Sequence, residues 1–137
     1  MVDAHAFTPP LDALLEAARE ASRLAYCPYS NFHVGAAIWA KGQIFSGANI
    51  ENASYGLTVC AERTATFAAI LAGAVEIEAV AVSCVDAPAD SEPSHLMPCG
   101  ACRQVLAEFA RPETPIVVDR VGTFTLAEIM PMAFRLR

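Results

Sequence analysis

Three cysteines and one glutamate have the types and the spacing that zinc chemistry requires. Cys60 and Glu62 belong to the sequence C-A-E, and Cys99 and Cys102 belong to the later sequence P-C-G-A-C. Each sequence opens a predicted helix, where the positive end of the helix dipole lowers the pKa of a thiol. Three thiolates could therefore bind one soft divalent ion, most simply zinc. Three protein ligands leave a fourth tetrahedral position open, which is typical of a catalytic site.

Glu62 stands too close to Cys60 in the sequence to be a convenient fourth ligand, but it is well placed to move protons beside the metal. A structural zinc site is the alternative, and it would need one more ligand. The candidates for that ligand are Cys27, Cys84, His33 and His95. Cys84 stands in an apolar run, so we expect it in the core, and His95 stands in a polar loop, so we expect it in solvent. The catalytic interpretation is therefore favoured.

The elements that would position these residues alternate between helix and strand. Apolar residues at helical spacing predict three longer helices, over residues 9–25 (after Thr8), 60–72 and 99–110. Apolar and hairpin-forming runs predict five strands, over residues 33–39, 43–48, 77–85, 115–119 and 123–124. We expect 115–119 to be a central strand, 86–98 to be a loop, and a short last helix to end near Pro131. This order predicts an α/β fold of three layers, α/β/α, in which helices cover both faces of a mixed five-stranded sheet.

Length and composition limit the kind of protein. The chain has 137 residues, so we expect residues 1–137 to form a single domain. Its 55% hydrophobic and 18% charged residues exclude a disordered chain. A net charge of −6 and a single lysine argue against a nucleic-acid partner, because phosphate neutralisation dominates such binding. A small neutral substrate fits better.

Compartment and cysteine use point in the same direction. No run of 18 apolar residues occurs, so we expect no membrane span. The first ten residues lack the basic and apolar regions of a secretion signal, so we expect the protein in the cytoplasm. Thiols stay reduced there, and the five cysteines then indicate metal binding or catalysis rather than disulfides.

Four motifs carry a resemblance to a known family. They are YCPYSNF at 26–32, GANIENA at 47–53, CAERTA at 60–65 and PCGACRQV at 98–105. In these motifs, and from roughly residue 11 to 134, the chain resembles the small homotetrameric zinc-dependent cytidine deaminases. The resemblance implies hydrolytic deamination of cytidine and deoxycytidine to uridine and deoxyuridine plus ammonia, in pyrimidine salvage. It also implies one Zn²⁺ per chain and a homotetramer in which neighbouring subunits complete each nucleoside site.

The resemblance assigns a role to each matching position. It makes Cys60, Cys99 and Cys102 the zinc ligands and Glu62 the catalytic proton shuttle. It assigns the substrate contacts as follows: Phe32 to the pyrimidine ring, Asn49 and Glu51 to the ribose hydroxyls, Ala61 (through its backbone) to the base, and Tyr55 and Phe134 to a neighbour's site. It makes Arg63 a hydrogen-bond donor to the thiolates, which offsets their negative charge.

The residues by themselves leave other roles open. Asn49 and Glu51 could equally serve a turn, Phe32 could anchor a loop, Arg63 could lie on the surface, and Phe134 could pack on its own subunit. Three rival functions also remain: deamination of another aminopyrimidine such as blasticidin S, editing of cytosine in nucleic acid, and a zinc-stabilised structural module. The pair Asn49 and Glu51, together with Arg63, favours cytidine over blasticidin S, and the negative charge argues against nucleic acid.

Overall fold

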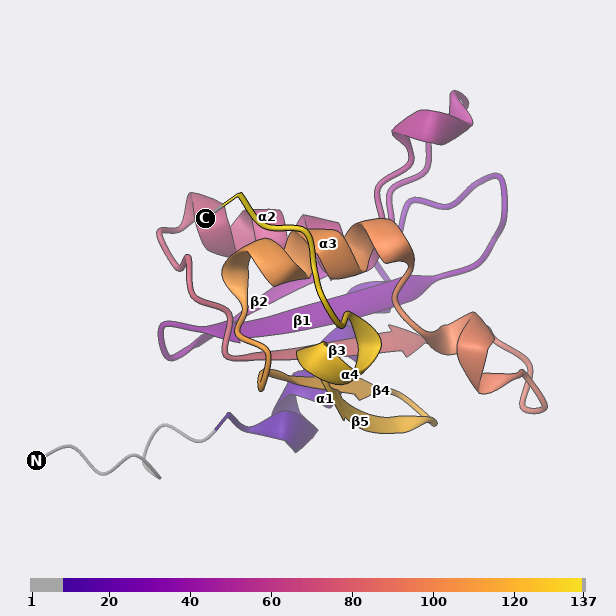
Figure 1. Cartoon of the computed structure of the whole chain (residues 1–137). Helices are drawn as coiled ribbons and strands as arrows, with labels where there is room; N and C mark the ends of the chain where they lie inside the picture. The colour runs from indigo at the N-terminus through magenta and orange to yellow at the C-terminus, as the bar shows by residue number, and fades with distance from the viewer. Residues whose placement is uncertain (1–8, 137) are drawn as a thin grey trace, which may run out of the picture.

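Five strands pair into one mixed sheet in the order β2-β1-β3-β4-β5 (Figure 1). The structure is a computed structural model, and it describes residues 9–136. Its elements are α1 (Leu11–Ser22), β1 (Val34–Ala40), β2 (Gln43–Ala48), the 3₁₀ turn η2 (Tyr55–Leu57), α2 (Ala61–Leu71), β3 (Ala79–Cys84), the 3₁₀ turn η3 (Pro93–Leu96), α3 (Gly100–Phe109), β4 (Pro115–Val118), β5 (Gly122–Thr125) and α4 (Leu126–Ile129). The α/β fold class predicted from the sequence is confirmed.

The strand pairing gives each predicted strand its place in the sheet. β1 pairs antiparallel with β2 and with β3, whereas β3 and β4 run parallel, as a crossover through α3 requires. β5 then returns antiparallel along β4 and forms an edge. The middle of the sheet is therefore β3, and the segment at 115–119, expected to be a central strand, is β4, which pairs with a neighbour on each side.

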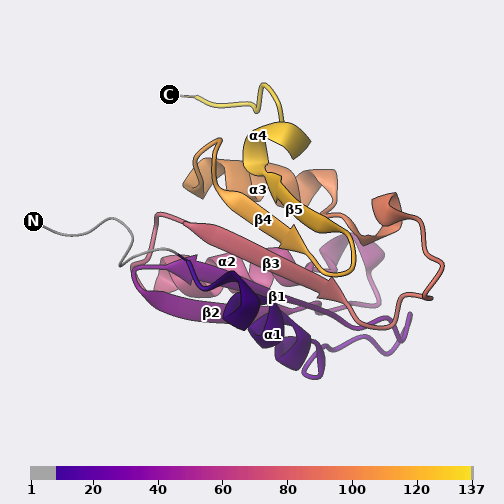
Figure 2. The ribbon, with the colours of Figure 1, turned by 90° about the horizontal axis from the view of Figure 1, so that it is seen from below.

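Helices cover both faces of the sheet. Figure 2 shows α1 in front of the sheet, with α2 and α3 behind it. Along β1 the side chains alternate between these faces: Ala37 packs with Leu14 and Ala18 of α1, whereas Ala36 and Ile38 belong to the larger core under α2 and α3. Because both faces are covered, β1 and β3 are almost entirely apolar.

The observed helices are shorter than the predicted ones, for local reasons. α1 begins after Pro10, which acts as its N-cap, and ends at Ser22, whose hydroxyl donates a hydrogen bond to the Arg19 carbonyl. Thr8, the expected start signal, lies outside the described residues. α2 stops just before Gly73, which takes a positive φ of 86° as expected of a residue that closes a helix. Within residues 9–136, no helix has the length and apolarity needed to cross a membrane.

Gly47 brings α2 unusually close to the sheet. A Cβ atom on Gly47 would lie 2.8 Å from the carbonyl oxygen of Ala61 and closer still to the amide nitrogen of Ala65. The Thr64 hydroxyl donates a hydrogen bond to the Ala48 carbonyl at 2.8 Å, which joins the same two elements. The first turn of α2 is therefore fixed directly on the backbone of β2.

Candidate active site

The N-termini of α2 and α3 bring three thiols together at one end of the sheet. Cys60 is the N-cap of α2, Cys99 is the N-cap of α3, and Cys102 lies in the first turn of α3. The sulfur atoms all lie within 4.8 Å of one another, with 3.5 Å between Cys99 and Cys102 and 4.0 Å between Cys60 and Cys99. Ligands at a Zn–S distance of ~2.3 Å around a tetrahedral ion stand ~3.8 Å apart, so this spacing fits zinc.

The charges around the thiols also favour a bound cation. The pKa of Cys60 is lowered to about 5, mainly by a hydrogen bond with Cys102 and secondly by the nearby guanidinium of Arg63. An Arg63 nitrogen donates to the Cys60 sulfur at 3.4 Å. The same shared hydrogen bond, together with burial, raises the pKa of Cys102. Three sulfurs at this spacing cannot all ionise without a compensating positive charge, and a divalent ion supplies that charge.

The structure brings none of the four other candidate ligands into this cluster: Cys27, Cys84, His33 and His95. Cys84, at the end of β3, is only partly buried, and its sulfur lies 3.9 Å from the Leu96 carbonyl oxygen. Burial raises its pKa to about 11, so it stays protonated. His95 is exposed, as expected. Among residues 9–136, three protein donors converge, and one tetrahedral position is left for water or substrate.

A cavity of about 220 Å³ adjoins the thiols. Cys60, Cys99 and Glu62 line its polar end, and Phe32 and Leu96 belong to its apolar wall. This mixture of an apolar wall with a few polar groups is typical of a small-molecule site. A larger hollow of about 350 Å³ lies at the opposite ends of the same strands, but its polar lining is exposed Glu and Arg side chains rather than a metal-binding group. Chemistry rather than size therefore identifies the site.

Glu62 lies in the first turn of α2 and lines the cavity beside the thiols. Only 5% of it is exposed, and this burial raises the pKa of its carboxyl to about 7. A carboxyl group with such a pKa can both accept and donate a proton near neutral pH. Ala61, fully buried before it, also lines the cavity, so its backbone is within the site.

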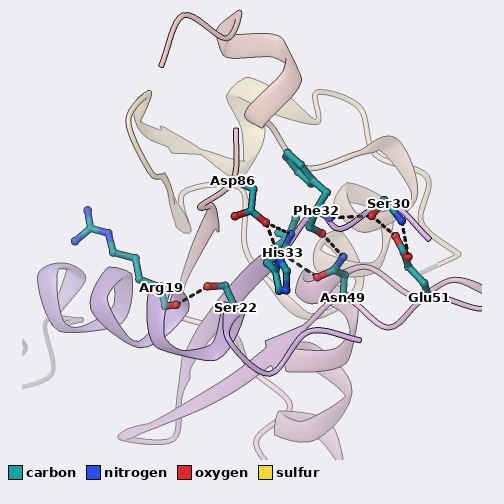
Figure 3. Close-up of polar contacts among 9 residues, drawn as sticks. Arg19, Ser22, Ser30, Phe32, His33, Asn49, Glu51 and Asp86 are labelled. Carbon is teal, nitrogen blue, oxygen red and sulfur yellow. Dashed lines mark hydrogen bonds and ion pairs between the residues drawn. The ribbon is translucent and has the colours of Figure 1, made fainter. Parts of the chain in front are cut away.

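Asn49 holds the backbone on both sides of His33, directly after Phe32 (Figure 3). Its side-chain oxygen accepts a hydrogen bond from the Val34 amide at 2.9 Å, and its nitrogen donates to the Phe32 carbonyl at 2.8 Å. An amide side chain has two donor hydrogens and two acceptor lone pairs, so one of each remains. Asn49 therefore serves the loop, as the alternative interpretation suggested, and still has capacity for a sugar hydroxyl.

Glu51 also holds the backbone of this loop, at Tyr29 and Ser30, which precede Phe32 (Figure 3). Its carboxylate accepts hydrogen bonds from the amides of Tyr29 and Ser30, at 3.0 and 3.2 Å, and from the Ser30 hydroxyl. These hydrogen bonds, led by that of the Ser30 hydroxyl, lower the pKa of Glu51. The Ser30 oxygen in turn accepts from the Phe32 amide at 3.0 Å. Sequence reasoning missed Ser30, although a serine two residues before Phe32 is a known turn signal.

Tyr55 and Phe134 do not line the thiol cavity of their own chain. Tyr55 is 88% exposed on the η2 turn, which stands out from the body of the molecule (Figure 1). Phe134 is 69% exposed, and its carbonyl accepts a hydrogen bond from the Gln104 side chain at 3.0 Å. Both side chains are therefore largely exposed, and packing within this chain buries little of either one.

Known proteins resemble this chain in sequence and in structure. Residues 10–118 match the family model described as "Cytidine and deoxycytidylate deaminase zinc-binding region". The cytidine deaminase of Halalkalibacterium halodurans is 45% identical over 126 residues, which cover 88% of this chain and 91% of that protein. The blasticidin-S deaminase of Bacillus cereus is 30% identical over 129 residues, covering 88% and 89%. The crystal structure of the Mycobacterium tuberculosis cytidine deaminase superposes with a TM-score of 0.80 at 38% identity, covering 94% of this chain and all of that one.

Proposed function

The chain belongs to the cytidine and deoxycytidylate deaminase family, and we propose that it is a zinc-dependent cytidine deaminase of pyrimidine salvage. It converts cytidine and deoxycytidine, by addition of water and loss of ammonia, to uridine and deoxyuridine. The observation that carries this proposal is a cluster of three thiols that leaves one coordination position open, with the buried carboxyl group of Glu62 in the same cavity.

The metal and Glu62 divide the chemistry between them. Zinc held by Cys60, Cys99 and Cys102 supplies a Lewis acid that lowers the pKa of water beside it. Glu62 takes the proton from the water as its oxygen adds to C4 of the cytosine ring, and it delivers this proton to N3. When the bond between C4 and the amino nitrogen breaks, Glu62 takes the remaining proton from the new C4 hydroxyl group, which becomes a carbonyl, and passes this proton to the departing ammonia. The raised pKa of Glu62 suits a group that both takes and gives a proton.

The remaining residues bind and orient the nucleoside. Phe32 packs against the pyrimidine ring, and the backbone of Ala61 contacts the base. Asn49 and Glu51 use their unspent hydrogen-bonding capacity on the ribose hydroxyls. Arg63, whose guanidinium donates to the Cys60 sulfur, reduces the negative charge that three thiolates would otherwise place on the metal.

Substrate choice is the direct test of this function. The absorbance of cytidine should fall when the zinc-loaded protein is added, and blasticidin S and a cytosine-bearing oligonucleotide should react far more slowly. Blasticidin S is included because a blasticidin-S deaminase is among the relatives, although it is less similar than the cytidine deaminase of Halalkalibacterium halodurans. Turnover of blasticidin S alone would overturn the proposal in favour of that rival, and zinc binding without any turnover would favour a structural module.

We also propose that the active unit is a homotetramer in which Tyr55 and Phe134 complete a neighbour's site. The exposure of both rings supports this, because an exposed aromatic side chain gains by burial against a partner. Subunits that carry Phe134→Ala and subunits that carry Glu62→Gln should partly rescue each other after they are refolded together. A fully active monomer in sedimentation, or verified mixed tetramers without rescue, would contradict shared sites.

The proposed substrate also leads to expectations about partners, compartment and zinc content. A single domain of this kind needs a nucleoside and neither a nucleic-acid nor a membrane partner. Its three zinc ligands must stay reduced, which favours work in the cytoplasm. Metal analysis should find about one zinc per chain, the number that one cluster of three thiols holds.

A further inference from the structure

Asp86 and His33 form a double contact beside the cavity (Figure 3). One carboxylate oxygen of Asp86 accepts a hydrogen bond from the His33 backbone amide at 2.7 Å and also contacts the ring nitrogen Nδ1 of His33 at 2.6 Å. Asp86 follows the end of β3, and His33 directly precedes β1. The contact thus joins the start of β1 to the segment after β3, at the same end of the sheet as the thiols.

The peptide group between Phe32 and His33 is held at both of its polar ends. Its carbonyl oxygen accepts from the Asn49 side chain, and its N–H donates to Asp86. A peptide group is planar, so only its rotation about the line between the two Cα atoms remains free. Side chains from two different segments, one after β2 and one after β3, fix that rotation. The direction in which Phe32 projects its side chain is set as a consequence.

The exposure of His33 and Asp86 indicates that the pair positions the backbone rather than stabilises the fold. The side chains of His33 and Asp86 are 39% and 41% exposed. Ion pairs this open to solvent contribute little to the free energy of folding. Phe32, in contrast, lines the cavity beside the thiols and packs against the core.

We propose that Asp86 is a positioning residue for the deaminase, which holds the backbone of Phe32 so that its ring meets the pyrimidine at the productive angle. The inference rests on the proposed function and adds a residue that neither touches the nucleoside nor belongs to the zinc motifs. The bond to the backbone N–H is the essential contact, and the His33 ring reinforces it through the same oxygen. Asp86 acts on substrate binding and leaves proton transfer by Glu62 untouched.

The test is the split between KM and kcat in zinc-loaded variants. Asp86→Ala should raise the KM for cytidine about 3- to 10-fold, as expected when an aromatic contact is weakened, and should leave kcat within about twofold. His33→Ala should have a smaller effect, because its backbone N–H still donates to Asp86. Asp119→Ala is the matched control: Asp119 accepts from Arg19 and Ser83, away from Phe32, and its loss should leave KM unchanged.

A double-mutant cycle shows whether Asp86 works through Phe32. In a Phe32→Ala background, Asp86→Ala should raise KM no further, because the ring that it positions is gone. Independent effects that multiply, an unchanged KM in Asp86→Ala, an unchanged KM in Phe32→Ala, or an equal rise in the Asp119→Ala control would each overturn the proposal.

A readout without substrate separates this inference from the proposed function. Hydrogen exchange of the His33 amide, followed by NMR, should become faster in Asp86→Ala and stay unchanged in Asp119→Ala. If the wild-type protein fails to deaminate cytidine, the proposed function is wrong. If exchange at His33 is not faster in Asp86→Ala, the positioning role is wrong, whatever the substrate.

Discussion

Gly47→Ala is expected to damage catalysis although Gly47 touches neither metal nor substrate. The added Cβ would lie 2.8 Å from the Ala61 carbonyl oxygen, about 0.6 Å short of the 3.4 Å at which ordinary contact begins, and it would approach Ala65 more closely still. It would also meet the Thr64 hydroxyl, but the Ala61 oxygen and the Ala65 nitrogen are backbone atoms of α2, so no change of rotamer can move those two aside. Either α2 or β2 must move by at least this distance.

A movement of either α2 or β2 would displace residues of the active site. α2 carries Cys60 at its N-cap and Glu62 in its first turn, and β2 leads directly to Asn49. Overpacking of this kind costs about 1–3 kcal/mol of stability. Misplacement of a reacting group by ~1 Å can cost ~10²-fold in rate, so we expect kcat/KM to fall by roughly 10- to 100-fold. A lower kcat would indicate that α2 has moved, and a higher KM would indicate that β2 has moved.

The assay compares Gly47→Ala with Gly42→Ala in the zinc-loaded protein. Gly42 lies in the turn of the same hairpin at a φ of 69°, with no atom near its missing Cβ. Alanine there costs about 1–2 kcal/mol through the left-handed backbone, without displacing either element. The control should therefore be less stable and fully active below its melting temperature. Wild-type kcat and KM in Gly47→Ala, or an equal loss of activity in Gly42→Ala, would refute the reasoning.

Three further predictions address single groups. Glu62→Gln should retain zinc and fold but lose at least ~10²-fold in kcat, because an amide cannot carry a proton; near-normal turnover would exclude Glu62 as the shuttle. Cys99→Ala should lose zinc in metal analysis, whereas Cys84→Ala should retain it, and the opposite pattern would contradict the three-thiol site. The Arg19 guanidinium lowers the pKa of Asp119 in the folded protein, so its stabilising effect exists above the unfolded pKa and is lost as pH falls through the folded pKa. Asp119→Asn should therefore be less stable than wild type at pH 7 in urea unfolding, and the difference should shrink as the pH falls below about 3.9, the usual pKa of an unfolded aspartate.

Local signals were enough to predict most of the elements and the metal cluster. Gly73 ends α2 as its sequence position indicated, and the β2 strand has the predicted bounds. The thiols of Cys60, Cys99 and Cys102 converge because each begins or lies near the beginning of a helix, which sequence periodicity reveals. The order of strands across the sheet is a different kind of information. It depends on which edge the chain returns to, and no local pattern shows this, although the 115–119 strand does have a neighbour on each side, as a central strand must.

Contacts between distant segments could not be predicted from the sequence. Asp86 and His33 are 53 residues apart, and neither the strand expected to begin at His33 nor the possible ligand role of His33 pointed to Asp86. The need for glycine at position 47 likewise arises only when α2 is laid on β2. Asp86 could have been suspected only as an acid that directly follows a strand, which is a weak signal because most such acids face solvent.

The proposed double role of Asn49 and Glu51, toward the loop and toward the sugar, would let a small domain hold a polar sugar site in a loop. Each side chain already forms hydrogen bonds that order the segment from Tyr29 to Val34, so the entropy of ordering is lost on folding rather than on binding. The groups left over are one N–H and one lone pair on Asn49 and one lone pair on Glu51. A ribose hydroxyl can meet them without breaking any bond that holds Phe32. The ring position and the proposed sugar contacts therefore belong to one hydrogen-bonded loop, and Asp86 binds this loop at the His33 amide, which Asn49 and Glu51 do not contact.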